Sequence, residues 1–338
     1  MKHLTHEIKQ LLRSCFVVTV LLLATTGAGL GQTQTPSTRW SDLAGNANAK
    51  TDYEENGGEY QIHTELGLAW LAKTVNSDSF AGTKVTLTKD LDLSEHLWTP
   101  IGYSGEKAFQ ETLFDGQGHT IQNIICTGTT DEFGYIAGGL FGYATHGTIQ
   151  NVKIDNANIT AIGKDNIGYA GGLMSFAQGE TITNCHVTNS TVTASGTQKF
   201  TLFPCAGGMA GKSEGGVFNN CTVSETKINT SHCGGGFVGE INDEYATRAS
   251  VFSQCSTTGC VITANSDNLS TTTETGAFIG KVVNHNNTSA KNIKAENCFT
   301  YGCEVIKSEE SKSNATAGLF TGDLEMNITI ENCFVQVQ

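Results

Sequence analysis

Residues 171–185 read GGLMSFAQGETITNC, in which a glycine pair with two apolar residues precedes a strand-like block that ends in Asn-Cys. Both blocks recur along the chain. The glycine block returns as 138–142 GGLFG, 207–211 GGMAG, 235–239 GGFVG, 276–280 GAFIG and 317–320 AGLF. The second block returns as 148–152 TIQNV, 217–221 VFNNC, 251–255 VFSQC, 294–298 KAENC and 329–333 TIENC, with an earlier copy in 119–124 HTIQNI.

The interval between copies varies while the blocks stay recognisable. Counted on the glycines, successive copies lie 28 to 42 residues apart. Constant blocks at drifting intervals are typical of a solenoid, because insertions loop outward while the stacked strands keep their register. A propeller blade would need four strands in about 40 to 45 residues, whereas we expect two or three strands per unit. The sequence therefore predicts an all-β, right-handed parallel β-helix with irregular repeats.

The second block alternates apolar and polar residues, as in Ile182 and Thr183, which indicates a strand with one buried face. One polar position recurs just after each alternating pair. An amide there can hydrogen-bond to the amides of the turns above and below, as in other stacked strands. We predict a structural ladder of Asn123, Asn151, Asn184, Asn220, Gln254, Asn297 and Asn332.

The residue after the ladder amide is a cysteine in the later copies and Ile124 or Val152 in the earlier ones. This exchange indicates an interior apolar slot, where cysteine acts as a small hydrophobe. The predicted cysteine ladder is Cys185, Cys221, Cys255, Cys298 and Cys333. Cys205 and Cys233 each precede a glycine block and form the predicted disulfide. The other spacings lack the short Cys-x2-Cys pattern of zinc knuckles, so no metal site and no cofactor are predicted.

The N-terminus has the order of a cleaved secretory signal: Lys2, Lys9 and Arg13, then an apolar run over 16–23 and small residues over 24–31. The run is shorter than the roughly 20 apolar residues that cross a bilayer. We therefore predict a signal peptide over 1–31, no membrane span, and a protein secreted to the extracellular space or the cell surface.

Charge excludes one class of partner. Without residues 1–31 the chain keeps 17 basic and 32 acidic residues, a net charge of −15, and only two arginines. A surface that tracks phosphates needs a basic patch, so no nucleic-acid binding is expected.

Residues 32–90 lack the repeated blocks. They are predicted to form a lead-in and a cap, with the solenoid over 91–338. A helix is expected from Glu65 to Val75, with Thr64 as its N-cap. Leu66, Ala69 and Trp70 form an apolar stripe at helical spacing. This stripe is expected to cover the open end of the first turn, which would otherwise expose unpaired strand edges.

A family resemblance rests on a series of short motifs. In order they are 60–62 YQI, 68–72 LAWLA, 90–93 DLDL, 98–102 WTPIG, 114–119 FDGQGH and the Gly-Gly-Leu-Phe-Gly units. Over about residues 60 to 338 the chain resembles bacterial secreted proteins that carry GLUG motifs. The resemblance implies a cell-surface or adhesin-like protein.

Three function classes are compatible with such a solenoid. A polysaccharide-degrading enzyme would need paired carboxylates, but Asp90, Asp92 and Asp115 lie at strand ends and in turns where aspartate is ordinary. A structural stalk of a larger surface protein is the second class. The third is a non-catalytic binding protein for an extracellular glycan or glycoprotein, with Phe200 and Tyr245 as candidate sugar-stacking aromatics in loops. The Thr-, Asn- and Ser-rich faces favour this third class.

Overall fold

The computed structural model describes residues 36–77, 80–131, 133–163, 166–196, 202–244, 246–266, 272–283, 292–308, 314–318, 320–324 and 328–336. The chain divides into two compact units, residues 1–36 and 37–338, and the second holds the helices and strands described here. Within the described ranges, no helix is long and apolar enough to span a membrane.

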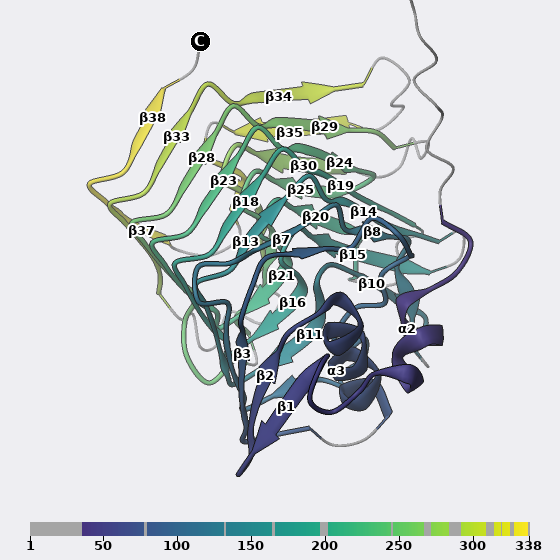
Figure 1. Ribbon diagram of the computed structural model, residues 1–338. Coiled ribbons are helices and arrows are strands. Elements are labelled where there is room, and N and C mark those ends of the chain that lie inside the picture. Colours follow the sequence, from purple (N-terminus) through teal and green to yellow (C-terminus); the bar gives the residue numbers. More distant parts are fainter. Residues whose placement is uncertain are drawn as a thin grey trace, which may run out of the picture. The chain divides into compact units, whose positions relative to one another are not determined.

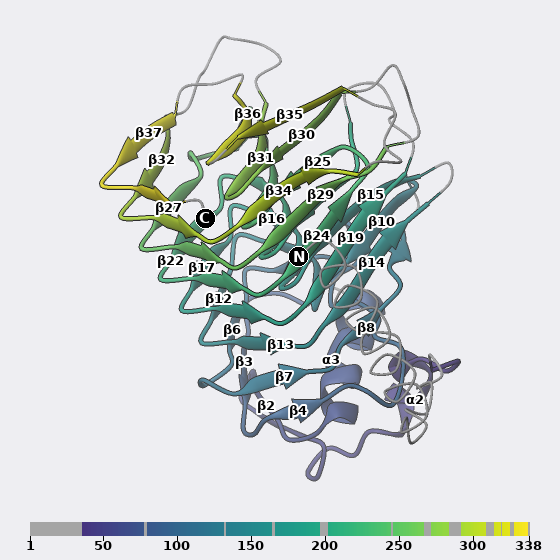
Figure 2. The same cartoon turned by 90° about the horizontal axis from the view of Figure 1, so that it is seen from above.

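Residues 37–338 form the predicted all-β parallel β-helix, in which turns follow one another in sequence order (Figures 1 and 2). The expected number of strands per turn is wrong. One complete turn runs through five strands, from Tyr135–Gly138 to Asn158–Ile162, rather than two or three. Outside the recurring block, strands of three residues such as His186–Thr188 escape recognition in the sequence because they show only one inward residue.

Strands at the same place in each turn pair into five sheets, named I to V in the order in which the chain passes through them. Sheet I contains β9 (Thr129–Thr130), β10 (Tyr135–Gly138), β15 (Ile167–Gly171), β20 (Cys205–Gly207), β25 (Cys233–Gly235), β30 (Thr272–Gly276) and β35 (Asn314–Gly318). Sheet II contains β5 (Phe109–Gln110), β11 (Phe141–Thr145), β16 (Met174–Gln178), β21 (Ala210–Glu214), β26 (Val238–Ile241), β31 (Ile279–Val282) and β36 (Thr321–Leu324).

Sheet III is the longest and contains β1 (Tyr53–Asn56), β2 (Glu59–Ile62), β3 (Lys84–Leu87), β6 (Leu113–Asp115), β12 (Thr148–Gln150), β17 (Thr181–Thr183), β22 (Val217–Asn219), β27 (Val251–Ser253), β32 (Ile293–Glu296) and β37 (Ile328–Glu331). Sheet IV contains β4 (Leu91–Asp92), β7 (Thr120–Gln122), β13 (Lys153–Asp155), β18 (His186–Thr188), β23 (Thr222–Ser224), β28 (Ser256–Thr258), β33 (Phe299–Tyr301) and β38 (Phe334–Gln336). Sheet V contains β8 (Ile125–Cys126), β14 (Asn158–Ile162), β19 (Thr191–Ser195), β24 (Lys227–Thr230), β29 (Val261–Ala264) and β34 (Glu304–Lys307). The pairs β1–β2 and β9–β10 are antiparallel, and sheet III already begins before residue 91.

Two short helical segments, α2 (Trp40–Leu43) and η1 (Ala44–Asn46), and the longer helix α3 (Glu65–Ser77) close the N-terminal end of the stack (Figure 1). The hydroxyl of Thr64 accepts a hydrogen bond from the Gly67 amide at 3.1 Å, which is the predicted N-cap. The buried face of α3 is shifted from the predicted stripe, because Leu66 and Trp70 are only half-buried. The face in the core is formed by Leu68, Ala69, Leu71, Ala72 and Val75.

The core of the stack is lined by aromatic rings that repeat from turn to turn. Phe237 stacks on Phe278 with ring centroids 4.8 Å apart, and Phe278 stacks on Phe320 at the same distance. Phe218 stacks in the same way on Phe252 at 5.1 Å. Register therefore places like residues over like, which is how a solenoid builds a continuous core.

Polar residues in left-handed backbone conformation turn the chain between sheets. Asn151, Asn184 and Asn220 have φ between 50° and 55° at the corner from sheet III to sheet IV. Asparagine tolerates this conformation better than most residues because its short side chain bonds locally. The recurring amide of the sequence thus serves backbone geometry as well as hydrogen bonding.

One buried carboxyl makes stability depend on pH. Glu180 is fully buried; its Oε2 accepts the Gly147 amide at 2.8 Å, and its Oε1 has no hydrogen-bond partner within the described residues. Burial raises the pKa of Glu180 to about 8 from the ordinary 4.5. The unfolded chain loses this proton at a lower pH than the folded protein does. The stabilisation that the protonated Glu180 carboxyl gives the folded protein is therefore complete below pH 4.5. It falls as the pH rises toward 8, by about 1.4 kcal/mol per pH unit.

We expect Glu180→Gln to remove this slope, because the amide keeps the acceptor for Gly147 and cannot ionise. Urea unfolding of the variant and the parent protein at several pH values between 5 and 8 measures the effect. The prediction is contradicted if the difference in free energy of unfolding between the parent protein and the variant is the same at every pH in this interval.

Candidate functional site

The face between sheets I and II holds charged and sulfur-containing side chains in a buried seam. One row of these side chains comes from residues paired in register on successive strands of sheet I, and a second row comes from sheet II. The seam is defined as Tyr169, Cys205, Cys233 and Glu274 of sheet I with Phe176, Lys212, Glu240 and Lys281 of sheet II. Each member is a direct register partner of its neighbours in the same sheet.

The seam is separate from the main core because alternate residues of a strand point to opposite sides. Ala206 belongs to the main core, whereas its neighbour Cys205 packs in a second cluster with Cys233 and Tyr169. A third cluster, which includes Tyr143 with Phe176 packed against it, fills the N-terminal part of the same face. The seam thus changes from aromatic in the early turns to ionic and thiol-bearing in the later ones.

Opposite charges alternate along sheet II. The Lys212 Nζ lies 3.5 Å from Glu240 Oε1 and 3.3 Å from Glu214 Oε1. The Lys281 Nζ lies 3.5 Å from Glu274 Oε1, on the facing sheet, and 3.9 Å from Asp323 Oδ2. Lys212 and Lys281 expose only 5% and 6% of their surface. Ions so far removed from water must be paired, and this arrangement pairs them.

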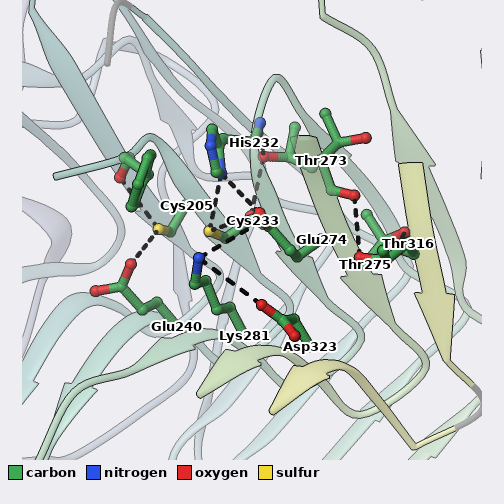
Figure 3. Close-up of polar contacts among 12 residues, drawn as sticks. Cys205, His232, Cys233, Glu240, Thr273, Glu274, Thr275, Lys281, Thr316 and Asp323 are labelled. Carbon is green, nitrogen blue, oxygen red and sulfur yellow. Dashed lines mark hydrogen bonds and ion pairs between the residues drawn. The ribbon is translucent and has the colours of Figure 1, made fainter. Parts of the chain in front are cut away.

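The thiols lie at the centre of the seam, beside an imidazole (Figure 3). His232 Nδ1 is 3.3 Å from Cys233 Sγ and 2.9 Å from Glu274 Oε2, and Cys205 Sγ is 3.5 Å from Glu240 Oε2. The Phe203 ring stacks on the His232 ring at 4.0 Å. These contacts restrict the imidazole to one orientation.

Burial and neighbours act in opposite directions on the acidities of this group. Burial disfavours charge on His232, but Cys233 and Glu274 outweigh it and raise the pKa of the ring to about 9. Burial also opposes ionisation of Cys233, yet the Cys205 hydrogen bond and the His232 charge lower the pKa of its thiol. Burial, and then Cys233, raise the pKa of the Cys205 thiol. Such displaced values mark candidate functional sites.

The geometry does not suit nucleophilic catalysis. In a cysteine–histidine–carboxylate triad the thiol and the carboxylate contact different ring nitrogens, whereas Cys233 and Glu274 both contact Nδ1 of His232. Cys233 is also fully buried. The group instead brings sulfur, nitrogen and oxygen donors together, which is an arrangement typical of metal ligands or of thiol chemistry.

The asparagines predicted from sequence form two ladders rather than one. Asn220 donates to Asn184 at 3.2 Å, Asn184 to Asn151 at 2.8 Å, and Asn151 to Asp115 at 2.9 Å. Asn123 is a correction. It lies at the next corner, where Asn156 donates to it at 2.7 Å. The tripeptide before it, in β7, pairs with β13 and not with β12, so sequence similarity aligned it with the wrong strand. Gln254, Asn297 and Asn332 share the left-handed conformation of the first ladder.

Carboxylates terminate both ladders at their N-terminal ends. Asp115 accepts the amides of Asn151 and Gln150, and Asp92 accepts those of Asn123 and Gln122. Burial opposes their ionisation, but these hydrogen bonds lower the pKa of both carboxyls. Two of the three aspartates considered as catalytic acids, Asp92 and Asp115, are therefore occupied within the scaffold.

The cysteines of the predicted ladder point into the stack at the corner between sheets III and IV. Cys185, Cys221 and Cys255 are fully buried. Ile124 lies at the following corner, after Asn123, and is therefore equivalent to Cys260 rather than to Cys185. Cys205 and Cys233 lie directly opposite each other on β20 and β25, and every described cysteine is a free thiol. Their disulfide stays a prediction.

Phe200 and Tyr245, the loop aromatics proposed for sugar stacking, lie outside the described residues. The structure shows other exposed aromatics on the outer face of sheet IV. Phe299, Tyr301 and Phe334 are 42%, 44% and 55% exposed, and form what we call the aromatic patch. Phe299 and Phe334 are register partners. The sequence signal for these exposed aromatics is the alternation around the inward-facing Thr300 and Val335.

Comparisons with known proteins support the fold more than the function. No protein-family model matches the chain. A 128-residue stretch is 35% identical to halomucin from Haloquadratum walsbyi; it covers 35% of this chain and 1% of halomucin. The crystal structure of a candidate immunoglobulin A1 protease from Bacteroides ovatus superposes with a TM-score of 0.52 and 16% identity, over 91% of this chain and 84% of that one. This second likeness shows a shared fold.

Proposed function

We propose that this protein is a secreted or cell-surface binding protein that recognises glycans or glycoproteins without catalysis, as its resemblance to GLUG-motif proteins implies. The match to halomucin, a surface protein, is compatible with such a location. The signal-like N-terminus supports a cleaved leader.

The observation that carries the proposal is the aromatic patch on sheet IV. Tyr301 stands side by side with the hydroxyl-bearing Thr258 of the preceding strand, which is partly exposed. Aromatic faces stack on the apolar C–H face of a sugar ring, and neighbouring hydroxyls suit its polar edge. A rigid sheet also holds these groups in place before the ligand arrives, which lowers the entropic cost of binding.

The test is binding of the purified protein to a glycan array and to soluble mucin. For any glycan that binds saturably, Phe299→Ala with Phe334→Ala is expected to weaken binding roughly tenfold or more, since tenfold corresponds to about 1.4 kcal/mol. Phe133→Ala is the matched control, because Phe133 is 65% exposed but lies between β9 and β10, two strands of sheet I.

The outcomes separate the function classes. Equal binding by the double variant and by the control would remove the aromatic patch from recognition. Failure of every glycan and mucin to bind would favour a structural stalk. Release of shorter saccharides from a polysaccharide would establish an enzyme instead.

A further inference from the structure

The buried seam and the adjacent His232 bring donor atoms of three kinds together. His232 Nδ1, Cys233 Sγ and a carboxylate oxygen of Glu274 lie within 4.8 Å of one another (Figure 3). A second group, Cys205, Cys233 and Glu240, satisfies the same limit and shares Cys233. Cys233 and Glu274 are 41 positions apart in sequence, so stacking of the turns alone brings them together.

Two of the three separations between the donor atoms match those around a tetrahedral zinc ion, and the third is shorter. Bonds of about 2.3 Å to sulfur and about 2.0 to 2.1 Å to nitrogen or oxygen place neighbouring ligand atoms roughly 3.3 to 3.8 Å apart. Cys233 Sγ lies 3.3 Å from His232 Nδ1 and 3.8 Å from Glu274 Oε2, and His232 Nδ1 lies 2.9 Å from Glu274 Oε2. To admit the ion, His232 Nδ1 and Glu274 Oε2 must move apart by about 0.4 Å, from 2.9 Å to the lower limit of this range.

The groups behind these ligands hold them in place. Lys281 contacts Glu274 through the other carboxylate oxygen, Oε1, at 3.5 Å, so Oε2 keeps its direction. The Phe203 ring lies against the His232 ring at 4.0 Å, and Thr230 accepts the His232 backbone amide at 3.1 Å. Outer contacts of this kind orient metal ligands and tune their affinity.

We propose that this seam binds one Zn²⁺ ion through His232, Cys233 and Glu274, with the Cys205 thiol, the next sulfur along the sheet, rotating to become the fourth ligand. The two thiolates and the carboxylate carry one negative charge more than the ion neutralises, and the Lys281 ammonium, 3.5 Å from Glu274 Oε1, offsets it. Lys212 stays paired with Glu240, and Lys281 with Asp323. The ion would join β20, β25 and β30 and act as a structural staple, independently of glycan binding.

The test is cobalt titration of the reduced, metal-free full-length protein, followed by displacement with zinc. We expect one equivalent of Co²⁺ to produce a thiolate-to-cobalt charge-transfer band with the d–d absorption of a tetrahedral site. Cys233→Ser and His232→Gln are each expected to weaken cobalt binding more than about tenfold, because each removes a ligand. Zinc should raise the melting temperature of the parent protein and not of these variants.

A matched control removes a different thiol. Cys221→Val deletes a fully buried cysteine outside the seam, at a corner position that Val152 holds in an earlier turn, and should bind cobalt like the parent protein. Glu274→Gln tests the carboxylate if the histidine variant does not fold.

Three results would overturn the proposal. The first is absence of the charge-transfer band. The second is a band that survives in the His232 and Cys233 variants but is lost in Cys221→Val. The third is a Cys205–Cys233 disulfide in the secreted protein, because the predicted disulfide uses the same sulfur atoms.

Discussion

Phe237→Ala is expected to lower the free energy of unfolding by about 4 kcal/mol, because it empties a large volume in a fully packed core. The Phe237 side chain is fully buried and lies 4.8 Å from Phe278, 5.5 Å from Phe218 and 5.9 Å from Phe252, measured between ring centroids. Loss of this ring removes contacts to two neighbouring turns at once. Equilibrium urea unfolding, followed by circular dichroism, measures the change.

Two variants calibrate this result. Phe237→Met should cost less than about 1.5 kcal/mol, since methionine fills most of the volume and Met209 holds the equivalent position one turn earlier. Phe133→Ala should cost little because Phe133 is 65% exposed. If Phe237→Ala unfolds at the same urea concentration as Phe133→Ala, the stacked phenylalanine rings of the core do not hold the turns together.

Gly235→Ala is expected to destabilise the protein by about 3 kcal/mol, although it adds a single methyl group. A Cβ atom at Gly235 would lie 1.9 Å from the carbonyl oxygen of Val238, which belongs to the backbone of the same bend and cannot rotate away. The clash recurs at Gly207 and Gly276, each with 2.0 Å to a carbonyl oxygen three residues on. The glycine block is therefore required by the sharp passage from sheet I to sheet II.

The matched control is Gly138→Ala, near the start of an earlier glycine block. A Cβ atom there meets atoms no closer than 3.0 Å, and its register partner in the next turn is Ala170. We expect its melting temperature to stay within a few degrees of that of the parent protein, whereas Gly235→Ala should melt well below it. Equal melting temperatures for the two variants would show that the bend can relax around an added methyl group.

The repeat blocks were sufficient to predict the parallel β-helix because the strands and corners of each turn can be recognised from short stretches of sequence. Inward-facing residues such as Ile149 and Ile182 follow the period-two rule of a strand. The recurring asparagine after them predicted the hydrogen-bonded ladder. The helix and its N-cap at Thr64 followed from equally local signals.

Local signals were insufficient where two corners looked alike. The block 120–123 TIQN repeats the tetrapeptide of residues 148–151, so Asn123 and Asn151 seemed equivalent. Hydrogen-bond register assigns them to different corners, since β7 pairs with β13 and β6 with β12. Short strands such as His186–Thr188 were missed for a different reason, because they show only one inward residue.

The sequence by itself determined the class of fold, the inward positions and the residues that turn the chain, because periodicity and backbone preference act over a few residues. Only the tertiary structure decided that His232 and Glu274 join the neighbouring cysteines Cys205 and Cys233, and that Phe299 and Phe334 stand together on an outer face. Loops of different length separate these residues in the chain. Which side chains oppose one another is set by the stacking of whole turns and by the contact of two sheets, and neither leaves a local pattern.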